Sequence, residues 1–301
     1  MNDKTVLVIG ATGRQGGAAA AHLLAAGLPV RALVRDPEAP AAKALRARGA
    51  ELRVGNLDDP GSLARAAAGA YGVFGVTPDD EDPEREVRRG HDLAEAAMAA
   101  GVAHFVFASV GGAERGTGIS YWESKWRIEQ HIRALGLPAT ILRPVRFMEN
   151  HAIPGLPVGG IVDDELRHLF DPETPVQLIA VTDIGAFARL ALTRPADYLG
   201  EAIELAGDEL TPSHTVRLIS DSLGREITYR QVPGDGLGLS RDAERALAGE
   251  RGVWQADIAG LRERHPGLLD FRTWLRHGGT EQIRALPAGT RRPSASEPSR
   301  A

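Results

Sequence analysis

Three residues in the first half of the chain have side chains and a spacing suited to acid–base chemistry. Ser109 follows an apolar run, Tyr121 comes 12 residues later, and Lys125 lies four residues beyond it. A helix places residues four apart on the same face. An ammonium beside a phenol lowers the pKa of the phenol, so the pair could hold and deliver a proton. We therefore predict Ser109, Tyr121 and Lys125 as catalytic residues.

Each of these residues also has a structural alternative. The helix face that begins with Tyr121 and Lys125 continues as an apolar stripe of Ile128, Ile132 and Leu135, so it points inward. A lysine at the start of such a stripe could extend its ammonium to solvent. A serine at a strand end could cap the next turn. Lysine is rare here, with three residues among 35 Lys and Arg, and this rarity favours a specific role for Lys125.

A glycine-rich segment near the N-terminus has the composition of a phosphate-binding turn. Gly10, Gly13 and Gly16 follow the branched run 5–9 directly and open a helical pattern. Glycine lets the backbone turn tightly and approach a pyrophosphate, and free N–H groups at the helix start favour its negative charge. The segment therefore predicts a dinucleotide site, with a purely structural tight turn as the alternative.

The residues after the second apolar run indicate which dinucleotide is bound. NAD-specific sites have an acidic residue near this point to bind the ribose 2′-hydroxyl. Here Arg35 comes first and could pair with a 2′-phosphate, and Arg14 in the glycine loop could join it. We expect NADP(H) on this ground. Asp36 keeps NAD(H) as the alternative, and abundant arginine makes Arg35 less informative.

Polar residues at two other strand ends extend the predicted cofactor site. Asn56 and Asp58 follow the third apolar run, where they could contact the adenine, although Asp58 or Asp59 could equally cap the next helix. Thr77 follows the fourth run, beside the expected nicotinamide ribose. The acidic run 79–84 indicates a solvated helix start, and we predict no metal site.

The segment after the sixth apolar run predicts the substrate end of the site. Phe147 and Asn150 lie just past that run, at the same expected sheet edge. Together with Tyr121 and a second lobe, they would surround the reactive carbon of a nicotinamide. Asn150, one of three Asn in the chain, could line this pocket or brace the loop.

The elements that must position these residues alternate regularly. Apolar runs predict strands at 5–9, 29–34, 51–54, 71–76, 104–108 and 139–142. Ala-rich amphipathic stretches between them predict helices at 14–26, 38–48, 60–68, 84–100 and 121–136. Glycines just past these helices favour left-handed C-caps at Gly27, Gly49, Gly69, Gly101 and Gly136. The alternation predicts an α/β fold with a Rossmann doubly wound parallel sheet.

The second half of the chain is less regular and predicts a smaller α/β lobe interleaved with the first. Residues 145–176 show no clear helix. Beyond them we expect strands at 176–181, 202–205 and 227–231, and helical segments at 183–192, 211–223 and within 240–277. Asp183 is expected to cap the first of these helices.

We divide the chain accordingly. The NAD(P)-binding Rossmann domain is assigned to 1–150, rejoined by about 176–205. The smaller substrate or partner lobe is assigned to 151–175 and 206–285. Residues 286–301 are Pro, Ser, Ala and Arg with no apolar period, which predicts a disordered tail.

Composition excludes several classes of protein. The 301 residues include no Cys, which excludes thiolate nucleophiles, iron–sulfur clusters and Cys-ligated zinc. No run approaches the roughly 18 apolar residues of a membrane span, and no signal peptide is visible, so we expect a cytoplasmic protein with no membrane partner. The net charge of −5 argues against a nucleic-acid partner. The sequence predicts no particular oligomeric state.

Several motifs together resemble the NmrA-like group of atypical short-chain dehydrogenases. The resemblance spans roughly residues 4–278. It rests on GATGRQGG at 10–17, GLPATILRP at 136–144, FMEN at 147–150, VTDIG at 181–185, LAGDELTP at 205–212 and FRTWLRHG at 271–278. The resemblance implies a Rossmann lobe with a small C-terminal lobe. It also implies an NADP(H) site that includes Gly10, Thr12, Gly13, Arg14, Gln15, Arg35 and Lys125.

The resemblance further implies one of two functions. Some members of the group reduce quinones or phenylpropanoids with NADPH, whereas others bind NADP(H) as redox sensors that control partner proteins. The Ser–Tyr–Lys set favours an NADPH-dependent oxidoreductase acting on a small carbonyl, enone or quinone. A non-catalytic sensor with a regulatory protein partner is the alternative. The chain has Thr77-Pro78 where the main reductase branch has Asn-Asn-Ala-Gly.

Overall fold

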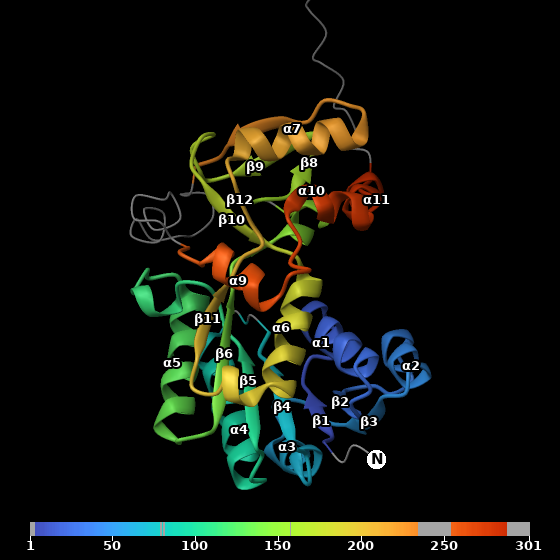
Figure 1. The fold of residues 1–301 in the computed structure, drawn as a ribbon, viewed down its shortest axis with the longest axis vertical. Helices are drawn as coiled ribbons and strands as arrows, with labels where there is room; N and C mark the ends of the chain where they lie inside the picture. Colours follow the sequence, from blue (N-terminus) through green and yellow to red (C-terminus); the bar gives the residue numbers. More distant parts are fainter. Residues whose placement is uncertain (1–3, 79, 81, 157, 234–253, 288–301) are drawn as a thin grey trace, which may run out of the picture.

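The fold is taken from a computed structural model of the chain, which describes residues 4–78, 80, 82–156, 158–233 and 254–287. The part of the expected helical pattern at 240–253, and the expected tail from residue 288 onward, lie outside the described residues. Figure 1 shows two parts stacked along the long axis, with the N-terminal part below and the smaller part above.

A seven-stranded parallel sheet forms the centre of the larger part. Its order is β11-β6-β5-β4-β1-β2-β3. The strands are β1 (Val6–Val8), β2 (Val30–Val34), β3 (Glu51–Val54), β4 (Gly72–Val76), β5 (His104–Ala108), β6 (Ala139–Pro144) and β11 (Ala202–Leu205). The chain reverses its direction of travel across the sheet between β1 and β4, which is where Rossmann sheets bind their ligands. The predicted α/β Rossmann fold is confirmed.

Helices cover both faces of this sheet and create two apolar cores. The helices are α1 (Arg14–Ala25), α2 (Pro40–Ala47), α3 (Pro60–Ala67), α4 (Pro83–Ala99), α5 (Ser120–Ala134) and α6 (Val181–Thr193). Successive strand residues point to opposite faces. Val6 and Val8 of β1 therefore join the core beneath α1 and α6, while Leu7 and Ile9 join the core beneath α3, α4 and α5. Burial on both faces explains why these strands read as continuous apolar runs.

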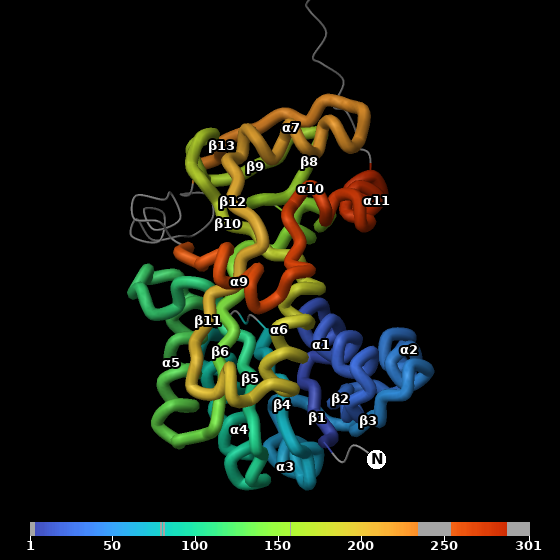
Figure 2. The backbone as a smooth tube through the Cα atoms, in the orientation of Figure 1, coloured from blue at the N-terminus to red at the C-terminus, as the bar shows by residue number. Residues whose placement is uncertain are grey.

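The smaller part contains two short sheets. One has the order β12-β10-β7, from β7 (Arg146–Phe147), β10 (Val176–Ile179) and β12 (Asp208–Leu210). The other has the order β13-β9-β8, from β8 (Ile161–Val162), β9 (Glu165–His168) and β13 (Thr228–Gln231). The tube in Figure 2 shows α7 (Pro212–Leu223) lying across the top of this part.

Short helical segments complete the described chain. The C-terminal ones are α9 (Ile258–Arg264), α10 (Phe271–Trp274), η5 (Leu275–Gly279) and α11 (Thr280–Arg284). Single turns occur at η1 (Ala113–Arg115), η2 (Met148–Ala152) and η3 (Pro195–Asp197). None of the helices in the described ranges is long and apolar enough to cross a membrane.

Most expected boundaries agree with the structure to within two or three residues, and all five predicted C-cap glycines have positive φ angles. The expected helix cap at Asp183 is wrong. The helix begins at Val181, two residues earlier, and the buried Asp183 carboxylate accepts a bond from the Leu269 N–H at 3.1 Å instead. The strand expected at 176–181 is β10, which pairs in a small sheet. Within the segment 176–205 that was expected to rejoin the Rossmann domain, β11 pairs with the large sheet and α6 packs against it. The hairpin of β8 and β9 was not predicted, and β8, with two residues, is too short to show an alternating pattern.

Candidate functional site

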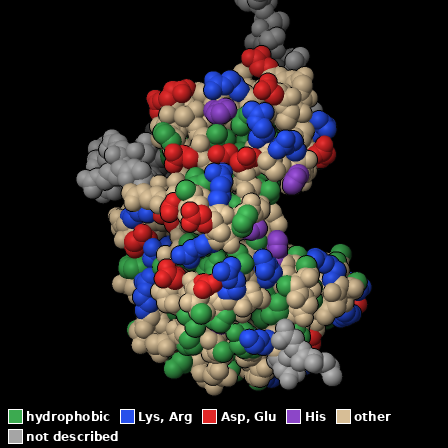
Figure 3. All heavy atoms as spheres, viewed as in Figure 1, with side chains coloured by type: hydrophobic (Ala, Val, Ile, Leu, Met, Phe, Trp, Pro, Cys, Tyr) green, Lys and Arg blue, Asp and Glu red, His purple; other side chains and the backbone are tan. Residues whose placement is uncertain are grey.

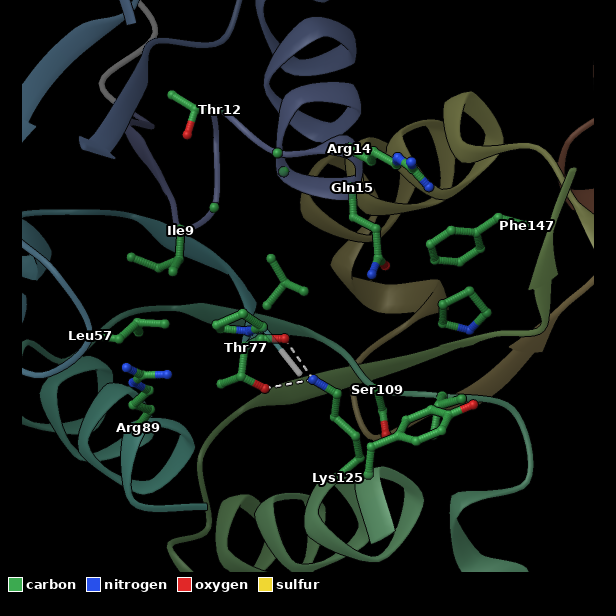
Figure 4. A pocket seen from close by; sticks show the side chains of 18 of the residues that line it. Ile9, Thr12, Arg14, Gln15, Leu57, Thr77, Arg89, Ser109, Lys125 and Phe147 are labelled. Carbon is green, nitrogen blue, oxygen red and sulfur yellow. Dashed lines mark hydrogen bonds between the residues drawn. The ribbon is translucent and has the colours of Figure 1, made fainter. Parts of the chain in front are cut away.

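One cavity of about 760 Å³ lies at the carboxyl edge of the large sheet and continues toward the smaller part. All predicted site residues line it. They are Gly10, Thr12, Gly13, Arg14, Gln15, Gly16, Arg35, Asn56, Asp58, Thr77, Ser109, Tyr121, Lys125, Phe147 and Asn150. Parallel strands end at the same sheet edge, so side chains far apart in sequence meet there. Figure 4 shows this space with Thr12, Arg14 and Gln15 on one side and Lys125 on the other.

The glycine turn brings the start of α1 against the end of β1. Gly10 has φ of +67°, and a Cβ added to Gly16 would lie 2.3 Å from the Gly10 carbonyl oxygen. The turn is closed by the Gly13 N–H, which donates to that carbonyl at 2.8 Å. Only glycine at position 16 permits this approach, because any β-carbon would overlap the backbone.

The first turn of α1 is prepared for an anion. Gly13 is the N-cap and supplies no capping side chain, and the first turn carries no acidic residue. The N–H groups of the first turn of α1, and the helix dipole, are therefore available to a negative group in the cavity. The side-chain oxygen of Gln15 is buried there without a hydrogen-bond partner among the described residues. These features fit the pyrophosphate and adjoining groups of a dinucleotide.

The end of β2 presents a base to the cavity. Arg35 lines the cavity, whereas Asp36 is not among its lining residues. The Asp36 carboxylate accepts a hydrogen bond from the Glu38 N–H at 2.8 Å and closes a local turn. The arrangement therefore favours recognition of a 2′-phosphate over a 2′-hydroxyl at this point.

The end of β3 contains an ion pair that sequence reasoning missed. Arg89 of α4 donates two bonds of 2.6 Å to the Asp58 carboxylate and one of 2.8 Å to Asp80. The hydrogen bond from Arg89 holds the pKa of Asp58 below its usual value. The cap expected at Asp58 or Asp59 belongs to Asp59, which accepts from the Ser62 N–H. Asn56 accepts from the Asp58 N–H at 2.7 Å.

Lys125 points into the protein and makes three short contacts. Its ammonium lies 2.7 Å from the Thr77 carbonyl oxygen, 2.6 Å from the Thr77 hydroxyl and 2.5 Å from a Glu86 oxygen. An ammonium has three N–H groups, so these three acceptors use all of them. Lys125 is 4% exposed, so the solvent-directed alternative is wrong.

Glu86 is the partner of Lys125 that sequence reasoning missed. Its side chain is almost completely buried and also accepts bonds from the hydroxyls of Thr77, at 2.9 Å, and Ser124. A signal for it exists in the sequence. Glu86 is followed at helical spacing by Gly90, Leu93 and Ala97, so a carboxylate occupies the inward stripe of α4. Such a carboxylate requires a buried partner.

Ser109 and Tyr121 line the cavity in different ways. The Ser109 hydroxyl donates to the buried carboxylate of Glu129 at 2.6 Å, and Glu129 also accepts two bonds from Arg143. Tyr121 is 40% exposed and packs edge-on against Trp122, with ring centroids 6.2 Å apart. The three predicted catalytic residues therefore share one cavity, while the bonds described for Ser109 and Lys125 go to other residues.

The far end of the cavity is mainly apolar. Phe147 and Asn150 line it next to two indole rings, those of Trp122 and Trp254, which lie 6.3 Å apart between centroids. Both indole N–H groups are buried without hydrogen-bond partners among the described residues. Trp254 comes from the chain before α9, so the smaller part contributes to the wall, as expected for a substrate pocket.

Comparison with known proteins identifies a family and several relatives of this chain. The model of the NmrA-like family matches residues 2–239. A (4-alkanoyl-5-oxo-2,5-dihydrofuran-3-yl)methyl phosphate reductase from Streptomyces griseus is 35% identical over 234 residues, which cover 76% of this chain and 78% of that protein. An NAD(P)H azoreductase from Xenophilus azovorans is 32% identical over 227 residues, which cover 74% of this chain and 76% of the relative.

Solved structures agree on the fold. The crystal structure of NmrA, a negative transcriptional regulator, in complex with NADP superposes with a TM-score of 0.79. It covers 95% of this chain and 98% of NmrA at 23% identity, which supports a common fold. The family match extends over more than two thirds of the sequence and includes the glycine turn, Arg35 and Lys125. The chain therefore belongs to the NmrA-like family.

Proposed function

We propose that this protein is an NADPH-dependent oxidoreductase that reduces a small carbonyl, enone or quinone. The observation that carries the proposal is the continuity of the cavity. It runs from an uncapped helix N-terminus and a base at β2 to an apolar end that contains a phenol. Two relatives above 30% identity are reductases, and one of them is described as using NAD(P)H.

The residues that would hold the cofactor follow from the strand order. The α1 N–H groups, Arg14 and Gln15 would hold the pyrophosphate side, and Arg35 would hold a 2′-phosphate. Asn56 and Asp58 would border the adenine, and Thr77 the nicotinamide ribose. Bound NADPH would supply the hydride that, with one proton, reduces the acceptor.

Tyr121 is the residue we propose as the proton donor. It combines a phenol with access to solvent, so it can be reprotonated after each turnover. Ser109 is a weaker candidate, because its hydroxyl hydrogen is directed to Glu129. Lys125 can bond a cofactor ribose only by exchanging one of its three present acceptors. The Thr77 hydroxyl is the most exchangeable, since it lines the cavity and keeps Glu86 as a partner.

The test is NADPH oxidation measured across a panel of quinones, enones and aldehydes. The wild-type protein should turn over at least one class, and Tyr121→Phe should lower kcat about 100-fold or more with an unchanged NADPH dissociation constant. Turnover that survives Tyr121→Phe would retain the reductase and reject this proton donor. Tight NADPH binding without turnover of any acceptor would refute the proposed reductase function.

The second candidate function is a redox sensor that reports the NADPH/NADP ratio to a protein partner. The commitment of Lys125 to Glu86 and of Ser109 to Glu129 favours it, because neither residue is free for a proton relay as the structure stands. The fold neighbour NmrA is described as a regulator with bound NADP. A sensor should distinguish NADPH from NADP in affinity or in protease sensitivity while it leaves every acceptor unreduced.

A further inference from the structure

Arg146 differs electrostatically from Arg89 and Lys125, two other cavity-lining bases that the protein pairs with carboxylates. It belongs to β7, lines the cavity and is partly buried, and its Nε atom is buried without a partner among the described residues. Its Nη2 atom donates a hydrogen bond to the Val158 carbonyl oxygen at 2.8 Å. No ion pair joins it to a carboxylate of the described part of the chain. Arg89, by contrast, is neutralised by Asp58 and Asp80.

The groups around Arg146 do not balance its charge. The phenols of Tyr121 and Tyr229 and the imidazoles of His151 and His168 are its titratable neighbours. Burial lowers the pKa of His151 to about 4, and burial also lowers the pKa of His168, so both rings are neutral at pH 7. Burial likewise lowers the pKa of Arg146 to about 10, which still leaves it charged at neutral pH.

The backbone holds this guanidinium in one place. Gly159 has φ of +78°, and a Cβ added there would lie 1.3 Å from the Arg146 Nη2 atom. The guanidinium therefore occupies the space that a side chain at position 159 would need, and Val158 fixes one of its nitrogens. Its Nε edge remains without a protein acceptor among the described residues. Leaving a desolvated cation unpaired is unfavourable unless a ligand supplies the counter-charge.

The position of Arg146 separates it from the phosphate groups expected of the cofactor. Arg35 follows β2 and Arg146 follows β6, and these strands are four positions apart in the sheet. At the usual strand spacing this is roughly 19 Å. The uncapped start of α1 lies between them, after β1. Arg146 lies instead beside Phe147 and Tyr121, at the end proposed for the acceptor.

We propose that Arg146 binds an anionic group of the acceptor, a carboxylate, sulfonate or phosphate, and so makes the preferred substrate an anion. The proposal rests on the proposed reductase function for its kinetic test and on binding alone for its second test. An oxyanion in the cavity would supply the counter-charge that the described residues do not give this guanidinium. The aromatic walls formed by Phe147, Trp122 and Trp254 would hold the apolar body of the same molecule.

The kinetic test compares two quinones with the same ring system. Menadione is neutral, and 1,4-naphthoquinone-2-sulfonate carries one negative charge. Arg146→Met should lower the ratio of kcat/KM for the sulfonate to that for menadione by roughly 10- to 100-fold, because a charged hydrogen bond is lost. Arg146→Lys should fall between, and Arg230→Met, an exposed arginine of the same part, should leave the ratio unchanged. An unchanged ratio in Arg146→Met would overturn the proposal while leaving the reductase in place.

The binding test needs no turnover. Naphthalene-2-sulfonate, naphthalene-2-carboxylate, 2-naphthyl phosphate and the neutral naphthalene-2-carboxamide are titrated into the NADPH-saturated protein by calorimetry. The three anions identify which oxyanion fits best. At least one should bind tenfold or more tightly than the carboxamide, and Arg146→Met should abolish that preference.

The remaining outcomes separate the two proposals. Anion binding that depends on Arg146, without turnover of any acceptor, would support the anion site and refute the reductase. Equal affinity of the wild type for the anions and the carboxamide would overturn the anion site. This measurement needs no variant, so it decides the question even if Arg146→Met does not fold. A loss of NADPH affinity in Arg146→Met or Arg146→Lys with unchanged discrimination between anion and amide would make Arg146 a cofactor contact, which also overturns it.

Discussion

At the scale of single residues, the cavity places its bases in different electrostatic environments. Arg89 is neutralised by Asp58 and Asp80, and Lys125 is neutralised by Glu86 inside the wall. Arg146 has no carboxylate partner among the described residues. The formal charge of a base therefore does not predict whether it binds a ligand. Burial and ion pairing decide this, because the charge of a paired base is already balanced by the protein.

The pairing of Lys125 with Glu86 makes a prediction about stability. Glu86→Gln leaves the buried ammonium without its counter-charge, so the free energy of unfolding should fall by about 3 kcal/mol, measured by urea denaturation. The double variant Glu86→Gln, Lys125→Met should lose less unfolding free energy than the sum of the losses in the two single variants, since both changes remove the same pair.

A matched control lies two residues earlier on the same helix. Glu84 pairs with Arg127 of α5 at the surface, where its side chain is 60% exposed. Glu84→Gln should therefore change stability only slightly, because solvent screens an exposed pair. Equal losses for Glu84→Gln and Glu86→Gln would show that burial does not set the strength of these pairs.

Arg35 makes a prediction about cofactor choice. Arg35→Ala should weaken NADPH binding roughly 10-fold and leave NADH binding unchanged, because only NADPH carries the 2′-phosphate. Cofactor fluorescence titration measures both constants. Arg53→Ala is the control, since Arg53 is an exposed arginine that pairs with Glu51 and is not among the cavity-lining residues. Parallel losses of NADPH and NADH affinity in Arg35→Ala would contradict the assignment.

At the scale of elements, the site depends on how closely α1 approaches β1. The glycine turn is short enough that the helix start meets the sheet at the Gly10 carbonyl. This approach directs the free N–H groups of the first turn toward the cavity. α1 also packs against α6, and Gly185 of α6 sits on the Ala18 backbone without room for a β-carbon. The position of α1 is thus fixed from two sides.

Gly16→Ala tests this geometry. The added methyl would lie 2.3 Å from the Gly10 oxygen, so α1 must move away from β1. We expect a loss of about 1–3 kcal/mol in unfolding free energy, together with at least tenfold weaker NADPH binding. Gly17→Ala is the matched control, because its methyl would lie 3.3 Å from the nearest backbone oxygen. NADPH binding by Gly16→Ala at the wild-type level would mean that the cavity does not need this approach.

At the scale of the whole molecule, the carboxylates of the partly buried Glu149 and the buried Asp183 join the two parts. Glu149 accepts two bonds of 3.1 Å from the Val181 N–H at the start of α6 and one of 3.2 Å from the Trp274 indole. Asp183 accepts from the Leu269 N–H. The face shown in Figure 3 carries Lys and Arg interspersed with Asp and Glu, with no single basic patch on it. These bonds act beside apolar contacts, since Leu261 and Leu268 share one core with residues of β1 and α1.

Glu149 gives this junction a pH dependence. Burial raises the pKa of Glu149 above its unfolded value of 4.5, so the folded protein holds the proton where the unfolded chain releases it. Its contribution to stability is therefore present below pH 4.5 and is lost as the pH rises through the folded-state pKa.

The Glu149→Gln variant tests this sign. It lacks the titration, so wild-type stability should fall relative to the variant as the pH is raised from 4.5, measured by denaturation at successive pH values. Glu281→Gln, at an exposed site on α11, should show no such trend. A difference between wild type and Glu149→Gln that is constant with pH would contradict this account.

Much of this molecule could be predicted from its sequence because the information is local. Strand and helix periodicity, glycine C-caps and the turn between β1 and α1 each depend on residues close together in the chain. Parallel strands then end at one edge, which is why the predicted cofactor and catalytic residues all line one cavity. The family motifs are local for the same reason.

Tertiary structure alone decided which charges are paired. Glu86 reaches Lys125 across two helices, Arg89 reaches Asp58 across 31 positions, and Ser109 bonds to Glu129 rather than to Tyr121 or Lys125. Periodicity says that a side chain points inward, but not which partner meets it there. That depends on where separate elements pack, since electrostatic pairing acts through space over a few ångströms. The same dependence leaves Arg146 without a carboxylate partner in the described structure.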